Sequence, residues 1–427
     1  MIDKRLLQLI LTDQKEELEL KAKRRFVYRR EEDLIDLDSP QAQVVIGVRR
    51  CGKSTLCLNK LKSAGVKFAY VNFDDERLST LEGSDLNDVL ETLYVINGDF
   101  PYLFIDEIQN IPEWYLFVNR LLRRDMHILI TGSNAKLLSG ELSTHLTGRH
   151  KPITLYPFSF AEFCEWKEVD THSLSTFNIA MRRRAFDEYL RQGGFPELLT
   201  IKDHKDYIDG LVHNIVHRDI EQRFRISYKH AFEEMLQHIL NVSPDIISEK
   251  NLSKTFKIKS EHTVANYIGY MEEAFLVSRL RKQSYRSRMR VHDEKVYPID
   301  VALMNKRKEA FNGSNLGSRL ETIVYIELLR RCLRQGHDLF YYTERYGECD
   351  FVVCKGEEVI AGIQVCYDIS NPDTLSREIK GLLLAARKLN FSRLLLLTDH
   401  EYEDREVDGY NIAIRPFYEF ALSDETL

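Results

Sequence analysis

The sequence predicts an α/β protein with a three-layer parallel sheet, then a mainly helical region, and finally a second α/β unit. Short apolar runs bounded by polar or glycine residues alternate with helical patterns over residues 39–165 and again after residue 310. Such runs are typical of strands buried on both faces of a parallel sheet. Between residues 166 and 300 the strand signal fades and helical periodicity dominates.

Composition excludes several classes of protein. The 427 residues are 44% hydrophobic and 30% charged, which is typical of a globular protein of roughly two to four domains. No apolar run approaches the roughly 20 residues that cross a bilayer, and the first residues lack a signal-peptide cleavage site. The seven cysteines are scattered without a C-x-x-C pair. A reducing compartment is therefore expected, and we predict a cytoplasmic protein that does not contact membranes.

The first α/β unit follows a charged helical arm predicted over residues 1–38. The carboxyl ends of its parallel strands are where ligands bind in sheets of this kind, and the motifs described next follow those ends. Five strands are expected, at Gln43–Ile46, Phe68–Phe73, Tyr102–Ile105, Ile128–Thr131 and Ile153–Leu155.

The most specific motif is Gly47–Thr55, which fits the phosphate-loop pattern G-x-x-x-x-G-K-[ST]. Gly47 and Gly52 permit turns that aim backbone N–H groups at phosphate oxygens. Lys53 adds a positive charge for the β- and γ-phosphates, and Ser54 offers Mg²⁺ a hydroxyl at a helix N-terminus. We therefore predict ATP and Mg²⁺ as cofactors. The predicted binding residues are Gly47, Arg50, Gly52, Lys53, Ser54 and Thr55.

A second motif is Tyr102–Glu107, an apolar strand that ends in two carboxylates. Asp106 is predicted to hold Mg²⁺, directly or through its water shell. Glu107 is predicted to polarise the water that attacks the γ-phosphorus. Phosphoryl transfer needs both charge neutralisation and an oriented nucleophile.

Weaker candidates follow other strands. Ser133 or Asn134 is predicted to contact the γ-phosphate or the attacking water, with ordinary turn chemistry as the alternative. Arg149 is predicted to stabilise the transferring phosphate, in cis or from a neighbouring subunit, with a structural salt bridge as the alternative. Asn72–Asp75 ends the second strand near the site, although capping of a surface loop is the favoured interpretation.

The helical region is predicted to contain Arg182–Gln192, Asp206–Phe224 and His230–Asn241. Two short amphipathic segments follow, and strand-like pieces come after them, which suggests a winged helix-turn-helix. The second segment carries several glutamates, and only its His262 and Asn266 are side chains suited to contact DNA bases. We therefore favour a structural packing role for this segment over DNA recognition. The segments are Ser248–Phe256 and Glu261–Phe275, and the strand-like pieces are Leu276–Val277 and Val296–Ile299.

Two basic runs stand out in a chain of net charge −6: Lys21–Arg30 and Arg279–Arg290. Either could grip the phosphate backbone of DNA or RNA. A solvated basic face, or pairing with the protein's own acids, is an equally good interpretation. A protein partner is the other expectation, and the oligomeric state is left open.

The last unit combines helices and strands again. Helices are expected at Arg319–Arg334 and Leu375–Lys388. Strands are expected at Leu339–Thr343, Asp350–Cys354, Val359–Tyr367, Leu394–Leu397 and Asn411–Ile414.

These motifs resemble those of bacterial and archaeal P-loop ATPases of the AAA superfamily that carry a winged helix and a C-terminal domain. The resemblance covers residues 30–400 and implies ATP binding and hydrolysis. It rests on Gly47–Thr55, Tyr102–Glu107, Ile130–Asn134 and Leu155–Phe163. We expect an arm (1–38), an ATPase core (39–165), a helical lid or linker (166–228), a winged-helix-like part (229–305) and a C-terminal domain (306–427).

The C-terminal domain resembles the restriction-endonuclease-like fold, in which a helix glutamate, a strand aspartate and an E-x-K motif support metal-dependent phosphodiester cleavage. Glu321 and Asp350 fit the first two places, but Gln364-Val-Cys366 stands where E-x-K is expected. Glutamine lacks the charge that hard cations demand. We therefore expect no nuclease activity, with Asp368 and Lys380 as the alternative source of the missing groups.

Three functions remain in competition. The first is a Mg²⁺-dependent ATPase whose C-terminal domain docks nucleic acid or protein. The second is an ATP-dependent nuclease. The third is a nucleotide-gated interaction protein with little turnover.

Overall fold

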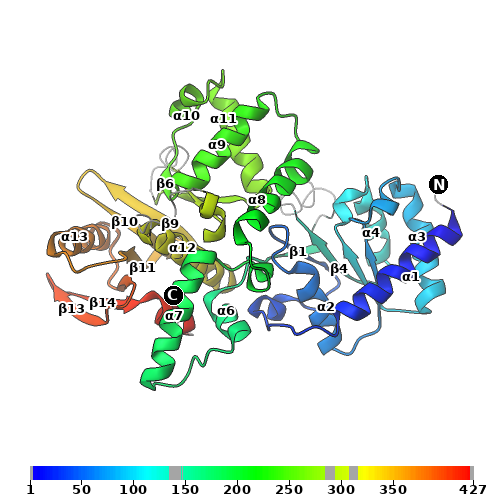
Figure 1. The fold of residues 1–427 in the computed structure, drawn as a ribbon, viewed down its shortest axis with the longest axis horizontal. Helices are drawn as coiled ribbons and strands as arrows, with labels where there is room; N and C mark the ends of the chain where they lie inside the picture. The colour runs from blue at the N-terminus through cyan, green and yellow to red at the C-terminus, as the bar shows by residue number, and fades with distance from the viewer. Residues whose placement is uncertain (1–2, 134–145, 147, 284–293, 307–315, 424–427) are drawn as a thin grey trace. The chain divides into compact units, whose positions relative to one another are not determined.

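The computed structural model describes residues 3–133, 146, 148–283, 294–306 and 316–423. It contains two compact units, both visible in Figure 1. The first comprises Met1–Pro157 with Glu273–Phe275, and the second comprises Phe158–Glu272 with Leu276–Leu427. The finer division into five parts stays a prediction.

The first unit contains the expected parallel sheet. Its five strands lie in the order β2-β3-β4-β1-β5, and every neighbouring pair is parallel. The prediction of five strands is confirmed, although the last one begins earlier than expected. The strands are β1 (Ala42–Ile46), β2 (Phe68–Asn72), β3 (Tyr102–Asp106), β4 (His127–Gly132) and β5 (His150–Thr154).

Burial explains why these runs form strands. All five side chains of β1 are buried, as are four of the five in β3, so neither strand has a wet face. Amphipathic helices connect the strands and contribute apolar side chains such as Leu56 and Leu61 to the core. They are α2 (Lys53–Ser63), α3 (Leu86–Asn97) and α4 (Trp114–Leu122), with short 3₁₀ turns at Glu76–Leu78, Gly83–Asp85 and Ile108–Asn110.

The predicted N-terminal arm is helical and belongs to the first unit. Helix α1 (Lys4–Lys21) is capped by Asp3 and packs against α3 and β2 with a buried apolar stripe. Its buried Gln14 also exchanges hydrogen bonds with the backbone of Asn72, at 3.0 and 2.9 Å. A 3₁₀ turn at Arg30–Leu34 completes the arm.

The second unit begins with helices and a small antiparallel sheet. The expected order of helix, turn, helix and strand pieces is present, while its classification as a winged helix stays a prediction. The helices are α6 (Phe160–Lys167), α7 (Thr176–Gln192), α8 (His204–Asn214) with its π-helical continuation η7 (Ile215–Glu221), α9 (Lys229–Val242), α10 (Glu249–Thr255) and α11 (Glu261–Glu273). The sheet has the order β6-β8-β7, from β6 (Asp245–Ile246), β7 (Val277–Arg281) and β8 (Glu294–Pro298). Short 3₁₀ helices lie at Pro196–Leu199 and Val301–Lys306.

The chain ends in a six-stranded mixed sheet of order β13-β14-β12-β11-β10-β9, in which β11, β12 and β14 run parallel. The expected strands and helices are present, and the structure adds β13 and α14. The elements are α12 (Leu316–Gln335), β9 (Asp338–Glu344), β10 (Gly347–Lys355), β11 (Glu358–Val365), α13 (Pro372–Leu389), β12 (Leu394–Thr398), β13 (Glu403–Val407), β14 (Tyr410–Pro416) and α14 (Phe417–Leu422).

Helix α13 lies close against this sheet. A Cβ at Gly381 would overlap the carbonyl oxygen of Glu348, so glycine allows the helix backbone to approach β10. Leu382, Ala385 and Ala386 of the same helix are buried in the core. The contact therefore positions the part of β10 that carries Glu348 and Asp350.

No helix among the described residues has both the length and the apolar character needed to span a bilayer.

Candidate nucleotide site

The phosphate-loop motif forms the connection between β1 and α2 at the carboxyl edge of the parallel sheet. Gly47 and Gly52 adopt φ values of 154° and 103°. A Cβ at Gly47 would overlap the carbonyl oxygen of Leu155. Both glycines are therefore required by the backbone, as the sequence predicted. Arg50 also has a positive φ, 70°, and its side chain is exposed.

Strand order brings the two acidic residues to this loop. β4 lies between β1 and β3 and runs parallel to both, so all three strands end at the same edge. Glu107 Oε1 lies 3.8 Å from Lys53 Nζ. The two motifs, separated by about fifty residues of sequence, therefore meet in space.

Lys53 is the first residue of α2 and is 5% exposed. Its ammonium donates hydrogen bonds to the carbonyl oxygens of Gly47 at 3.1 Å and Val48 at 3.2 Å. The loop therefore surrounds the lysine side chain, and the ammonium points toward the backbone carbonyls of the loop.

Asp106 is buried at the tip of β3. Its carboxylate accepts hydrogen bonds from the hydroxyls of Thr131, of Ser54 and of Tyr70, the last at 3.2 Å. Burial and the neighbouring charge of Glu107 raise the pKa of Asp106, against the opposing effect of its hydrogen bonds and Lys53. A nearby cation would stabilise the ionised form of this buried carboxylate. The Ser54 hydroxyl, which is hydrogen-bonded to Asp106, is close enough to bind the same cation.

Glu107 adopts a left-handed backbone conformation, with φ of 54°. Its Oε2 accepts hydrogen bonds from the Ser133 backbone N–H at 3.2 Å and hydroxyl at 3.1 Å, and from the amide of Gln109. Burial favours the neutral acid, but Lys53 and Arg49 outweigh it and lower the pKa of Glu107. The group is therefore held ionised and in a defined orientation.

The tip of β2 also reaches the loop. Arg49 forms an ion pair with Asp74 at 3.1 Å, so Asp74 contacts the phosphate loop. Asp75 instead accepts hydrogen bonds from Arg77 and caps a short 3₁₀ turn. Asp74 therefore fits the interpretation that this segment reaches the site. Asp75 fits the interpretation that the segment caps a loop.

Arg29 is a site residue that sequence reasoning did not single out. It lies in the basic run Lys21–Arg30, yet it is buried, and its guanidinium donates to the carbonyl oxygens of Cys51 at 3.2 Å and Tyr156 at 2.7 Å. It therefore holds the phosphate loop to the segment after β5. These two contacts are made to backbone carbonyls, so pairing with acids stays a prediction for this residue.

The remaining predicted residues divide into three groups. Ser54 and Thr55 lie in the first turn of α2, with Thr55 exposed. Asn134 lies outside the described residues.

Arg149 precedes β5, and His150 pairs with Ala42 at the amino edge of the sheet. Four residue steps of about 3.3 Å, or about 13 Å, separate that edge from the phosphate loop. The role predicted for Arg149, in cis or from a neighbouring subunit, stays a prediction.

The second basic run is partly engaged with acids. Arg279 forms ion pairs with Glu272 at 2.6 Å and Glu294 at 3.0 Å, and Arg281 lies 3.4 Å from Glu294. Residues 284–290 of the run lie outside the described part of the chain. Pairing with the protein's own acids therefore holds for the arginines at the start of this run.

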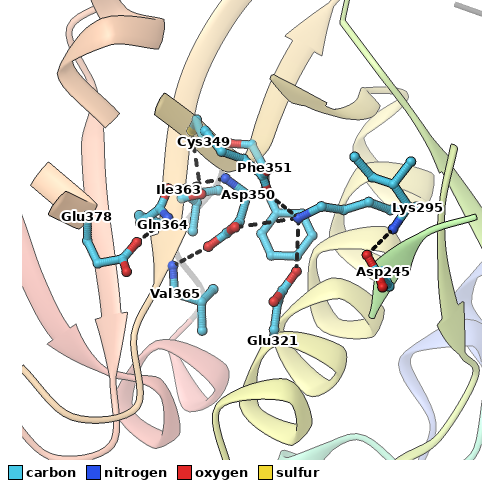
Figure 2. A network of polar contacts seen from close by, with 12 residues as sticks. Asp245, Lys295, Glu321, Cys349, Asp350, Phe351, Ile363, Gln364, Val365 and Glu378 are labelled. Carbon is cyan, nitrogen blue, oxygen red and sulfur yellow. Dashed lines mark hydrogen bonds and ion pairs between the residues drawn. The ribbon is translucent and has the colours of Figure 1, made fainter. Parts of the chain in front are cut away.

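A second polar cluster lies in the C-terminal sheet (Figure 2), where α12 and β10 bring Glu321 and Asp350 together. Gln364 of β11 lies beside them and accepts a hydrogen bond from the Asp350 backbone N–H at 3.2 Å. The three predicted positions therefore share one site. Asp368 and Lys380 are exposed, and their role as a source of the missing groups stays a prediction. Lys295 of β8 contacts the carboxylates of both Glu321 and Asp350.

The sequence of this chain is similar to those of two known proteins over most of its length. The chain is 32% identical to an uncharacterized protein of Methanocaldococcus jannaschii over 444 aligned residues, which cover 99% of this chain and 97% of that protein. The chain belongs to the same family as this archaeal protein. An uncharacterized protein of Haemophilus influenzae is 30% identical over 389 residues, covering 88% of this chain and 93% of that protein.

In this chain, residues 39–164 match the family model described as an AAA domain. Residues 183–313 match a domain of unknown function, DUF8612. A Walker-type ATPase of Pyrococcus abyssi aligns structurally with 65% of this chain and 95% of its own, at 13% identity and a TM-score of 0.41. Residues 39–164, which hold the parallel sheet and the phosphate-loop motif, are therefore an AAA domain.

Proposed function

We propose that this protein binds ATP with Mg²⁺ at the carboxyl edge of the first sheet and hydrolyses it. The observation that carries the proposal is the meeting of Lys53 and Glu107, 3.8 Å apart, inside an AAA domain. The buried ammonium, the phosphate loop and the paired acids are the parts that phosphoryl transfer requires.

The residues present fit both cofactors. The ammonium of Lys53 is bound by neutral backbone carbonyls, and phosphate oxygens are stronger acceptors for a charged donor. The hydroxyl of Ser54 and the carboxylate of Asp106 are hard oxygen ligands of the kind that Mg²⁺ prefers. When bound there, Mg²⁺ would neutralise charge that develops on the β- and γ-phosphates.

Glu107 is proposed as the general base. Its lowered pKa keeps the carboxylate ionised and able to accept a proton from water. The two hydrogen bonds from Ser133 hold one of its oxygens in place. Ser133 therefore acts as a positioning residue for the base.

The second unit is proposed to be a docking module for nucleic acid or protein, with a winged-helix-like part and a restriction-endonuclease-like part. Helix α12, strands β9–β11, helix α13 and strand β12 follow one another in the order expected of the latter fold. A nucleotide-gated interaction protein with little turnover is the alternative, since the same loop would serve a switch.

Phosphate release by the purified chain tests this proposal directly. We expect release that requires Mg²⁺ and stops when EDTA removes it, and we expect DNA, RNA or a protein partner to change its rate. Tight ATP binding with negligible release under every condition would favour the nucleotide-gated alternative. Failure to bind ATP–Mg²⁺ at all would overturn both.

Arg149 is proposed to act on the site of a neighbouring subunit, because it precedes β5 at the amino edge of the sheet, about 13 Å from its own phosphate loop. Mixing inactive Lys53→Ala protein with inactive Arg149→Ala protein should then restore some turnover, since a mixed interface pairs an intact loop with an intact arginine. An Arg149→Ala variant with unchanged phosphate release would end this assignment.

A further inference from the structure

Three carboxylates surround one buried ammonium in the C-terminal sheet. Lys295 Nζ lies 3.3 Å from Glu321 Oε1 and 3.6 Å from Asp350 Oδ1, and it also contacts Glu348. Glu321 comes from α12, whereas Glu348 and Asp350 come from β10. Figure 2 shows the lysine side chain extending from β8 toward Asp350 and Glu321.

The packing of β8 directs the lysine to this place. Lys295 and Tyr297 are two residues apart and share one face of the strand. Tyr297 donates a hydrogen bond to Glu321 Oε1 at 2.8 Å and stacks on Tyr325 of α12, with ring centroids 4.1 Å apart. The ring of Tyr341 lies 5.5 Å from the ammonium. An aromatic layer therefore seals the lysine against the sheet.

The ammonium remains charged although it is only 8% exposed. Burial alone would lower the pKa of Lys295, but Glu321, Asp350 and Glu348 outweigh it and raise the pKa. Burial, with the neighbouring acids, raises the pKa of Asp350 and of Glu321, and Lys295 opposes both shifts. The cluster therefore places three acids around one cation, which is the lysine.

Gln364 and one oxygen of Asp350 are already engaged by other partners. The side-chain oxygen of Gln364 accepts the Asp350 backbone N–H, and its amide donates to Glu378 at 2.6 Å. Asp350 Oδ2 accepts the Val365 backbone N–H at 2.9 Å. Among the described residues, no group of three or more His, Cys, Asp or Glu side chains is arranged to hold a metal ion. The divalent metal that a restriction-endonuclease-like fold implies does not fit this arrangement.

We propose that Glu321, Glu348 and Asp350 form a cation site that the chain fills with its own Lys295, so that an internal ammonium stands where a nuclease would hold a divalent metal. The lysine ties β8 to α12 and β10 without an external ion. The C-terminal sheet is therefore a metal-independent structural unit, and β8 is joined to it by charge as well as by packing.

The test compares thermal unfolding of the nucleotide-free protein in excess Mn²⁺ and in EDTA. The native chain should show no Mn²⁺-dependent shift that Asp350→Asn removes, because the ammonium occupies the site. Lys295→Met leaves three carboxylates facing one another, so Mn²⁺ should raise its melting temperature by at least about 2–4 °C. Lys355→Met removes a lysine that is exposed at the end of β10 and is the matched control, with no expected shift.

The double variant Lys295→Met/Asp350→Asn assigns the gain to the cluster, because it should lose the Mn²⁺ response. A Lys295→Met protein that folds but does not respond to Mn²⁺ would overturn the proposal. So would a native chain with a Mn²⁺ shift abolished by Asp350→Asn, or with Mn²⁺-dependent cleavage of DNA or RNA that the same change abolishes. These two measurements use variants other than Lys295→Met, so they decide the question even if that variant does not fold.

Discussion

The Glu107→Gln variant should retain ATP binding and lose phosphate release by a factor on the order of 10²–10⁴, the usual contribution of a general base. The amide has nearly the same shape as the carboxylate and keeps an oxygen for the N–H and hydroxyl of Ser133. It cannot accept a proton from water. Binding is measured by calorimetry with ATP–Mg²⁺, and turnover by phosphate release.

Glu113→Gln is the matched control for this variant. Glu113 also has a positive φ, 55°, but its side chain is exposed and follows the short turn after the site. It should leave turnover unchanged. Phosphate release by Glu107→Gln at the native rate would remove Glu107 from the role of base.

The pH dependence of the native chain follows from the same carboxylate. Its pKa lies below the ordinary value of 4.5, so the ionised base persists as pH falls and is lost only below the range of a typical glutamate. We therefore expect no loss of turnover from protonation of Glu107 between about pH 6 and 8. A rate that falls with pH through this window in the native chain and in Glu113→Gln alike, while the residual rate of Glu107→Gln does not fall, would contradict this expectation.

The second large effect is expected for Lys53→Ala, which should weaken ATP binding by roughly 10- to 150-fold. A hydrogen bond to a charged group is worth about 1.5–3 kcal/mol, and each 1.4 kcal/mol is about tenfold in affinity. The side chain is buried between the loop and Glu107, so the substitution also leaves Glu107 without its nearest cation. Calorimetry with ATP–Mg²⁺ measures the loss.

Lys67→Ala is the control for the change in charge. Lys67 is exposed and lies just before β2, outside the loop. Its removal should not alter ATP affinity. Equal ATP affinity for the native chain and Lys53→Ala would show that this loop does not bind the phosphates.

Much of the first unit could be predicted from residues close together in sequence. The strands are short apolar runs, and the glycine positions of the phosphate loop require positive φ values that the structure contains. The pairing of Asp106 and Glu107 with Lys53 was also predictable, because parallel strands end at one edge of a sheet. The highly charged strand Glu403–Val407 was missed because an exposed edge strand has no apolar signal.

Other assignments needed the three-dimensional fold. Arg29 sits in a basic run that resembles a solvated surface, and only tertiary packing buries it against the loop. Arg149 follows the loop in sequence, but the direction of β5 carries it to the far edge of the sheet. For Arg29 the side chain's type was compatible with more than one role, and its position in the fold selected one.

The amino-acid sequence by itself determined the parallel sheet of the first unit and the glycine-bearing loop that joins β1 to α2, because glycine conformation, strand burial and acidic strand ends are local properties. Only the tertiary structure decided what neutralises the acids of the C-terminal sheet. Lys295 comes from a separate strand 26 residues before Glu321, and nothing in its neighbours along the chain distinguishes it from a surface lysine. Its role depends on the packing of β8, and a charge buried by packing is a property of the folded chain.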